Sequence, residues 1–228
     1  MTIAGLQKTS LLDYPGHVAA VVFLAGCNMN CGYCHNRSLI SGSAEGFRPE
    51  DAEDFLALRK GLLDGVCITG GEPTIHADLP GFIGRIKAMG FAVKLDTNGA
   101  NPEMLEDLLC ENLLDYIAMD VKAPREKYDL VAGIAVSWEK IEQSIELIKA
   151  SGVDYEFRTT LVKELDERDV FAICSRLAGA KRFALQQHQK RGANGLIEAV
   201  SYGRQYMQGL QERISRFFTE CLLRGASV

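Results

Sequence analysis

Short apolar runs rich in β-branched residues alternate with longer amphipathic segments along most of the chain. Short apolar runs bounded by Gly or polar residues predict buried strands, whereas apolar residues three and four positions apart predict helices. The predicted strands are 17–25, 65–69, 91–95, 115–121, 153–161 and 182–186. The predicted helices are 49–60, 79–89, 102–111, 137–150, 167–177 and 204–223.

Alternating strands and helices predict an α/β fold with a parallel sheet and right-handed crossovers. The six units fall short of a closed eight-stranded barrel, so an open partial barrel and a doubly wound sheet both agree with the pattern. Ligands collect at the carboxyl ends of the strands in either architecture. No linker or low-complexity tract divides the chain, although 36–47 and 187–201 look irregular. We therefore expect a single domain over 1–228, with a core of about 17–190 and a C-terminal helix of about 203–224.

Composition narrows the class of protein. Hydrophobic residues make up 47% and charged residues 24%, which excludes disorder as the main state. The formal net charge of −5 gives no reason to expect nucleic acid or an anionic membrane as a partner. The N-terminus lacks the pattern of an export signal, and no apolar run is long enough to span a bilayer. A cytoplasmic protein is expected.

Three of the seven cysteines are clustered in one short loop after the first predicted strand. Cys27, Cys31 and Cys34 are separated by three and two residues, and free thiolates at this spacing suit an iron–sulfur cluster or zinc. Three ligands would leave one iron of a four-iron cluster open for catalysis. The alternative is a structural zinc site in which His35 supplies the fourth ligand.

The motifs that follow resemble those of the radical S-adenosylmethionine superfamily. The cysteine loop has that family's C-x3-C-x2-C pattern with an aromatic residue, Tyr33, before the last cysteine. Further matches resemble the glycyl-radical-enzyme activase branch and extend over roughly 6–188. They are Asp13-Tyr14-Pro15-Gly16, Cys34-His35-Asn36-Arg37, Asp96-Thr97-Asn98-Gly99 and Asp120-Val121-Lys122. Gly70-Gly71-Glu72-Pro73 resembles the GGEP motif of the superfamily as a whole. The resemblance implies a partial (β/α)6 barrel, like that of TIM barrels but open, with a radical SAM core.

The resemblance also implies the cofactors and the residues that bind them. One 4Fe-4S cluster would be held by the three cysteines, and S-adenosylmethionine would bind beside it, with a monovalent cation near its carboxylate. The segment of Gly70, Gly71 and Glu72 would hold the methionine amino group, and Tyr33 would contact the adenine. The remaining cofactor-binding residues implied by the resemblance are Asp96, Thr97 and Asp120 around the cation, and Lys122, Arg158 and His188 near the cofactor.

Several of these residues have simpler explanations. Glu72 is also placed to cap a helix after Pro73, and Asp96 to begin an Asx turn. Asp120 and Lys122 are spaced for an ordinary ion pair, Arg158 for a structural salt bridge, and His188 for a solvated loop. Cys67 is predicted on a strand, and Cys110, Cys174 and Cys221 on helices, as packing residues. A single cluster is therefore expected.

The function implied by the resemblance is activation of a glycyl-radical enzyme. Such an activase cleaves S-adenosylmethionine reductively to a 5′-deoxyadenosyl radical, which abstracts hydrogen from a glycine of the partner. Anaerobic ribonucleoside-triphosphate reductase is the best-fitting partner, and flavodoxin or ferredoxin the expected electron donor. One alternative is a small-molecule radical enzyme such as a deazapurine-forming synthase, for which Gln186, Gln187 and Gln189 could contact a heterocycle. Another is a non-catalytic module that binds zinc or a cluster.

Overall fold

The computed structural model describes residues 1–40, 46–191, 197–199 and 202–225. Its strands are β1 (Ile3–Ser10), β2 (Ala19–Leu24), β3 (Gly65–Gly70), β4 (Ala92–Thr97), β5 (Tyr116–Asp120), β6 (Asp154–Leu161), β7 (Arg182–Gln187), β8 (Gln189–Arg191), β9 (Ile197–Ala199) and β10 (Glu220–Arg224). Its α-helices are α1 (Pro49–Ala57), α2 (Leu79–Ala88), α3 (Pro102–Cys110), α4 (Tyr128–Ala132), α5 (Trp138–Ala150), α6 (Glu167–Arg176) and α7 (Arg204–Ile214). Short 3-10 helices lie at η1 (Arg37–Leu39), η2 (Pro73–Ile75), η3 (Arg125–Lys127) and η4 (Ser215–Phe217).

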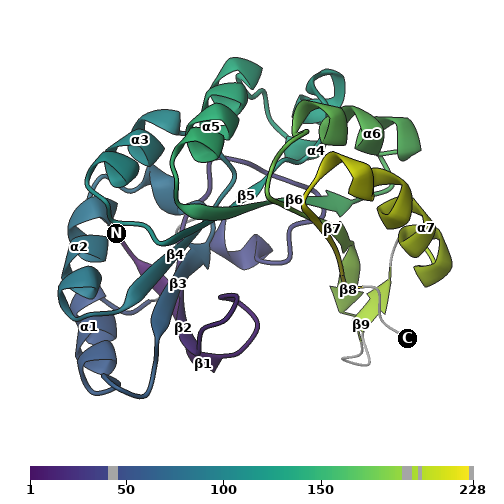
Figure 1. The fold of residues 1–228 in the computed structure, drawn as a ribbon. Helices are drawn as coiled ribbons and strands as arrows, with labels where there is room; N and C mark the ends of the chain where they lie inside the picture. The colour runs from purple at the N-terminus through teal and green to yellow at the C-terminus, as the bar shows by residue number, and fades with distance from the viewer. Residues whose placement is uncertain (41–45, 192–196, 200–201, 226–228) are drawn as a thin grey trace.

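One curved sheet organises the molecule. Its strand order is β1-β2-β3-β4-β5-β6-β7-β10, and every neighbouring pair is parallel except β1 with β2. The six predicted parallel strands correspond to β2 to β7, so the predicted α/β fold with a parallel sheet is confirmed. The sheet bends into an open arc, with the helices along its outer side (Figure 1).

The two faces of the sheet differ in polarity, because successive side chains of a strand point to opposite sides. On the outer face, residues such as Val22, Ile68 and Phe157 are fully buried in the main hydrophobic core beneath the helices. The inner face instead carries charged groups, including Lys94, Asp96 and Arg158. The apolar core therefore lies outside the arc, and the polar chemistry lies inside it.

The C-terminal segment differs from the sequence-based prediction. A helix over 204–223 was expected, but α7 ends at Ile214 and the chain continues as β10, which pairs in parallel with β7. Cys221 consequently lies on a strand, where a helix was predicted. The backbone becomes extended at Phe218, whose ring stacks on Phe183 of β7 at a centroid distance of 4.7 Å.

Four other elements were not anticipated from the sequence. The N-terminal β1 adds an antiparallel edge strand, α4 follows β5, and β8 pairs with β9 within the stretch that looked irregular. Among the described residues, no helix is both long and apolar enough to cross a membrane.

Candidate active site

The carboxyl ends of the parallel strands surround a cavity of about 420 Å³ inside the arc. Twelve of the thirteen residues predicted to bind the cluster or the cofactor line it, and they come from the cysteine loop and from the ends of β3 to β6. They are Cys27, Cys31, Tyr33, Cys34, Gly70, Gly71, Glu72, Asp96, Thr97, Asp120, Lys122 and Arg158. Motifs far apart in the sequence therefore converge on one site.

His188, the remaining predicted residue, lies just outside that set. Its ring meets the rings of Tyr33 and His35 edge-on, each at a centroid distance of 5.8 Å. Lys122 approaches Tyr33 from another side, with its Nζ 6.0 Å from the ring centroid. The aromatic residue of the cysteine loop is thus bordered by two of the other predicted cofactor-binding residues.

The cysteine loop is held by its own hydrogen bonds and by distant segments. Met29 N donates to Cys27 Sγ at 3.4 Å, and Cys34 N donates to the Cys31 carbonyl at 3.2 Å. From the far side, Asn30 N donates to the Ala132 carbonyl at the end of α4, at 2.9 Å. The loop backbone is therefore positioned by the protein itself.

Two glycines after β3 allow that strand end to approach the cysteine loop. Gly70 has a φ of +119°, a conformation that side chains with a Cβ rarely adopt. A Cβ on Gly71 would lie only 1.8 Å from the Gly26 carbonyl oxygen. The close backbone contact is completed by Glu72 N, which donates to that same carbonyl at 2.8 Å. Glycine is required here by the packing of two loops.

Three thiols in this setting fit an iron–sulfur cluster. Cys27, Cys31 and Cys34 are free thiols of one loop that line one cavity, and thiolate is the ligand such clusters take. Burial raises the pKa of the Cys27 and Cys31 thiols, and the nearby Lys122 acts in the opposite direction. His35, the fourth ligand of the zinc alternative, is exposed. Across the described residues, no three His, Cys, Asp or Glu side chains converge on a single-ion site.

Glu72 joins the loops after β3 and β4. Its carboxylate is 1% exposed; Oε1 accepts from Thr74 N, Thr74 Oγ1 and Thr97 Oγ1, and Oε2 accepts from Asn98 N at 2.7 Å. Burial raises its pKa, against the lowering effect of these hydrogen bonds. Glu72 is also the N-cap of η2, so the capping role considered from the sequence is real. The same side chain lines the cavity.

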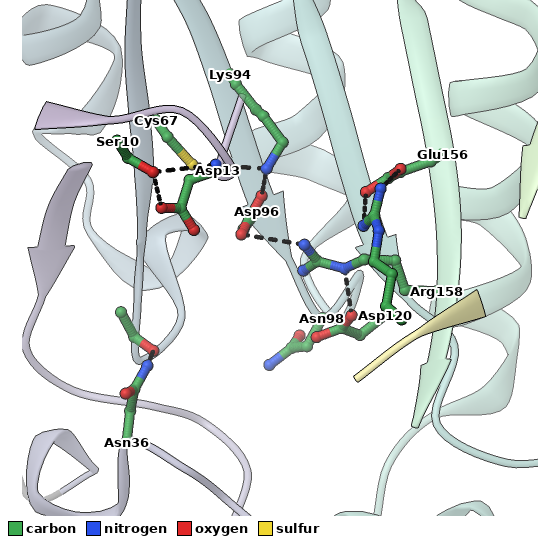
Figure 2. Close-up of polar contacts among 12 residues, drawn as sticks. Ser10, Asp13, Asn36, Cys67, Lys94, Asp96, Asn98, Asp120, Glu156 and Arg158 are labelled. Atoms are coloured by element: carbon green, nitrogen blue, oxygen red, sulfur yellow. Dashed lines mark hydrogen bonds and ion pairs between the residues drawn. The ribbon is translucent and has the colours of Figure 1, made fainter. Parts of the chain in front are cut away.

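A buried network of charges forms the inner wall. Asp96 lies between Lys94 and Arg158, and the Arg158 guanidinium lies between Asp96 and Asp120 (Figure 2). Burial raises the pKa of the Asp96 carboxyl, but Arg158 and Lys94 outweigh burial and lower that pKa to about 2. Asp120 and Lys122 form a looser pair at 3.9 Å. The salt bridges proposed as simpler explanations are present, and their members face the cavity.

Thr160 is a cavity residue that was not singled out from the sequence. It is the register partner of Gln186, which was considered only as a contact for a heterocycle. Asn98, noted only within a motif, donates through Nδ2 to Asn28 Oδ1 at 2.8 Å. Asp13 was noted only as part of a motif. The alternation of side chains along a strand could have identified Thr160 from the sequence, because it lies two positions after Arg158 and must share its inward face.

An open α/β barrel with three soft thiols at the carboxyl ends of its strands defines a class: enzymes that place an iron–sulfur cluster at the mouth of a barrel. The particular family is shown by a family model described as the Radical SAM superfamily, which matches residues 21–177. The chain belongs to this superfamily and is an enzyme that uses a 4Fe-4S cluster and S-adenosylmethionine.

Relatives of known name agree with this assignment. The chain is 38% identical over 200 residues to "Putative glycyl-radical enzyme activating enzyme MJ1227" of Methanocaldococcus jannaschii, covering 84% of this chain and 81% of the relative. It is 26% identical to a 7-carboxy-7-deazaguanine synthase of Thermococcus kodakarensis, covering 74% of this chain and 73% of the relative.

Solved structures show the same fold at low sequence identity. Streptococcus suis SuiB superposes with a TM-score of 0.66 at 15% identity, over 90% of this chain, which spans only 48% of that structure. A domain of a pyruvate-formate lyase-activating enzyme from Bacteroides vulgatus gives a TM-score of 0.57 at 17% identity, over 71% of this chain and 99% of that domain.

Proposed function

We propose that this enzyme activates a glycyl-radical enzyme by removing a hydrogen atom from a glycine of its partner. The observation that carries the proposal is the 38% identity to the named activating enzyme, which extends over most of both chains. The activase-type motifs support it, because the structure brings residues from four of them to one cavity. The partner best suited to these motifs is anaerobic ribonucleoside-triphosphate reductase, and the electron donor is a flavodoxin or ferredoxin.

In this proposal Cys27, Cys31 and Cys34 hold the cluster. When bound, the cluster supplies the electron that cleaves S-adenosylmethionine. The chain's part is to fix the loop through Asn30 and Gly71 and to surround the site with walls that exclude water. A radical must meet the intended hydrogen first, so positioning decides the outcome.

Residues around the cavity bind and orient S-adenosylmethionine. Glu72 Oε2 accepts one bond from Asn98 N, and a carboxylate oxygen can accept a second from the methionine ammonium. Arg158 and Lys122 offer positive charge to the methionine carboxylate, and Tyr33 offers its ring to the adenine. These contacts fix the methionine and the adenine on either side of the sulfonium. His188 contributes by packing against Tyr33.

The cavity also suits a peptide. Thr160, Gln186 and Asp13 line it, and their side chains together provide donors and acceptors such as an extended backbone requires. A glycine without a side chain is the residue that brings its Cα closest to a buried reactive group. We further propose that the chain works as a single domain, supported by the one sheet that includes β1 to β7 and β10, and that it works in the cytoplasm.

The test is direct detection of the product radical. Anaerobically reconstituted enzyme, reductant and S-adenosylmethionine are incubated with the candidate reductase and followed by electron paramagnetic resonance. A glycyl-radical signal should appear, accompanied by 5′-deoxyadenosine, and should be missing when the partner glycine is replaced by alanine. Cleavage of S-adenosylmethionine with no radical on any glycyl-radical partner would reject the proposal.

A deazapurine-forming synthase is the second candidate, favoured by the relative that matches similar shares of both chains. Of the glutamines considered for it, Gln186 lines the cavity, whereas Gln187 Nε2 donates to the Tyr202 carbonyl. The side chain of Gln189 lies outside the described residues. Formation of 7-carboxy-7-deazaguanine by the purified enzyme would favour this function over the first.

A further inference from the structure

The resemblance to activases implies a monovalent cation among Asp96, Thr97 and Asp120. A cation site needs oxygen ligands whose negative charge is not already compensated by cations of the chain itself. All three residues line the cavity, so their surroundings decide whether they fit such an ion.

The Asp96 carboxylate is engaged on both oxygens. Oδ1 pairs with the Lys94 ammonium from the same strand, and Oδ2 pairs with Arg158 Nη1 at 3.2 Å. Lys94 is 2% exposed, its Nζ lies 3.5 Å from Cys67 Sγ and 6.0 Å from the ring centroid of Tyr116. Asp96 is the carboxylate that neutralises this deeply buried ammonium, as Figure 2 shows.

The other two oxygen donors are also engaged. Asp120 Oδ1 accepts from Arg158 Nε at 2.8 Å, and its Oδ2 faces Lys122 Nζ at 3.9 Å. Thr97 Oγ1 donates to Glu72 Oε1 at 2.7 Å and accepts from Gly99 N at 3.1 Å. The residues therefore do not fit the implied ion, because two carboxylates already face three cations of the chain and a further cation would meet repulsion.

We propose that the buried ammonium of Lys94, together with Arg158, takes the place of a monovalent cation, so that S-adenosylmethionine binds independently of Na⁺ and K⁺. Because the Lys94 ammonium is part of the chain, neither Na⁺ nor K⁺ has to bind together with the cofactor. The proposal rests on the use of S-adenosylmethionine by this enzyme and not on the identity of its partner.

The first test uses the wild-type holoenzyme. Equilibrium binding of S-adenosylmethionine is measured by isothermal titration in buffers of equal ionic strength containing Na⁺, K⁺ or only tetramethylammonium. The dissociation constants should agree within about threefold. Tighter binding by more than that factor on adding Na⁺ or K⁺ would overturn the proposal. Because no partner protein is present, the result is separate from the test for glycyl-radical activation.

The second test removes the ammonium. Lys94→Met should weaken binding about tenfold in tetramethylammonium, in line with the loss of one charge-assisted interaction, and added K⁺ should recover part of the loss. Lys140→Met is the matched control, because Lys140 pairs with Glu103 at 2.8 Å on the surface and should leave affinity unchanged. Unchanged affinity of Lys94→Met would contradict the proposal. If that variant does not fold, the wild-type ion series decides alone.

Discussion

Cysteine has two different roles in this chain, and the surroundings of each thiol separate them. Cys27, Cys31 and Cys34 line the cavity, whereas Cys67 and Cys174 are buried outside the loop. Burial raises the pKa of Cys67 to about 12 and raises that of Cys174 as well. A buried thiol of this kind reacts slowly, since the thiolate is the nucleophile.

These environments predict an order of labelling. With the cluster in place at pH 8, the exposed Cys110 should react first with a maleimide, and Cys67 and Cys174 should react slowest, because both are fully buried and burial raises the pKa of each thiol. Mass-spectrometric mapping of the labelled peptides measures this, and Cys110→Ser should remove the fast phase. Rapid labelling of Cys67 in the folded protein would contradict the assignment.

Site residues were predictable where they sit in motifs at strand ends, and much less so where they sit within strands. Glu72 and Asp96 follow buried strands in short polar motifs, so sequence alone places them at the site. Lys94 was missed because a lysine within an apolar run gives no signal of its partner. That partner, Asp96, lies on the same inward face two residues later, and alternation was the clue.

At the scale of elements, β10 is tied to the barrel by an ion pair between Arg224 and a buried carboxylate. Arg224 reaches across β7 and donates to both oxygens of Glu156 on β6, each at 2.7 Å. Glu156 is only 1% exposed, so its carboxylate depends on the bidentate contact with Arg224 for charge compensation. Removing one member of a buried pair leaves an uncompensated charge.

Loss of that arginine should therefore destabilise the fold. Arg224→Ala should lower the free energy of unfolding by about 3 kcal/mol, measured by urea denaturation. Lys181→Ala, which removes an exposed pair with Asp154 at 3.3 Å, should change it by less than about 1 kcal/mol. Adding Glu156→Gln to Arg224→Ala should restore part of the loss. Equal effects of the two alanine variants would show that β10 is not anchored by this pair.

The C-terminal segment that contains β10 is also where the prediction of helices and strands from the sequence was wrong. The helices and inner strands were found within a few residues, because their apolar spacing is clear. The C-terminal segment kept apolar residues at helical spacing through Met207, Leu210 and Ile214 and beyond, without Gly or Pro to end it. Tertiary contacts redirect it, namely the pairing of β10 with β7 and the stacking of Phe218 on Phe183. The edge strand β1 was missed because much of it is exposed and lacks a continuous apolar run.

For the whole molecule, the core and the active site occupy opposite faces of one sheet. The fully buried residues Phe82, Ile86 and Phe157 belong to the core beneath the helices, and none of them lines the cavity. The main source of folding free energy is therefore separate from the cluster. This differs from small metal-dependent domains, which unfold when metal is removed.

Cluster removal should consequently leave the barrel folded. Anaerobic chelation, or Cys31→Ala, should take iron from about four per chain to nearly none. Far-UV circular dichroism should stay unchanged, and hydrogen exchange in β2 to β7 should stay slow. Cys110→Ala, which replaces an exposed thiol, is the matched control and should keep its iron. A cooperative loss of ellipticity on chelation would contradict this separation.

The contact between the cysteine loop and the end of α4 has a consequence for how the enzyme matures. Gly133, at φ +73°, lies so close to the loop that a Cβ there would come within 2.2 Å of the Asn30 carbonyl oxygen. Folding of the polypeptide thus orders the backbone of the cysteine loop before iron binds. A protein that delivers the cluster would meet three thiols on a loop that is already positioned. Substituting this remote glycine should slow loading of the cofactor rather than alter the chemistry that follows.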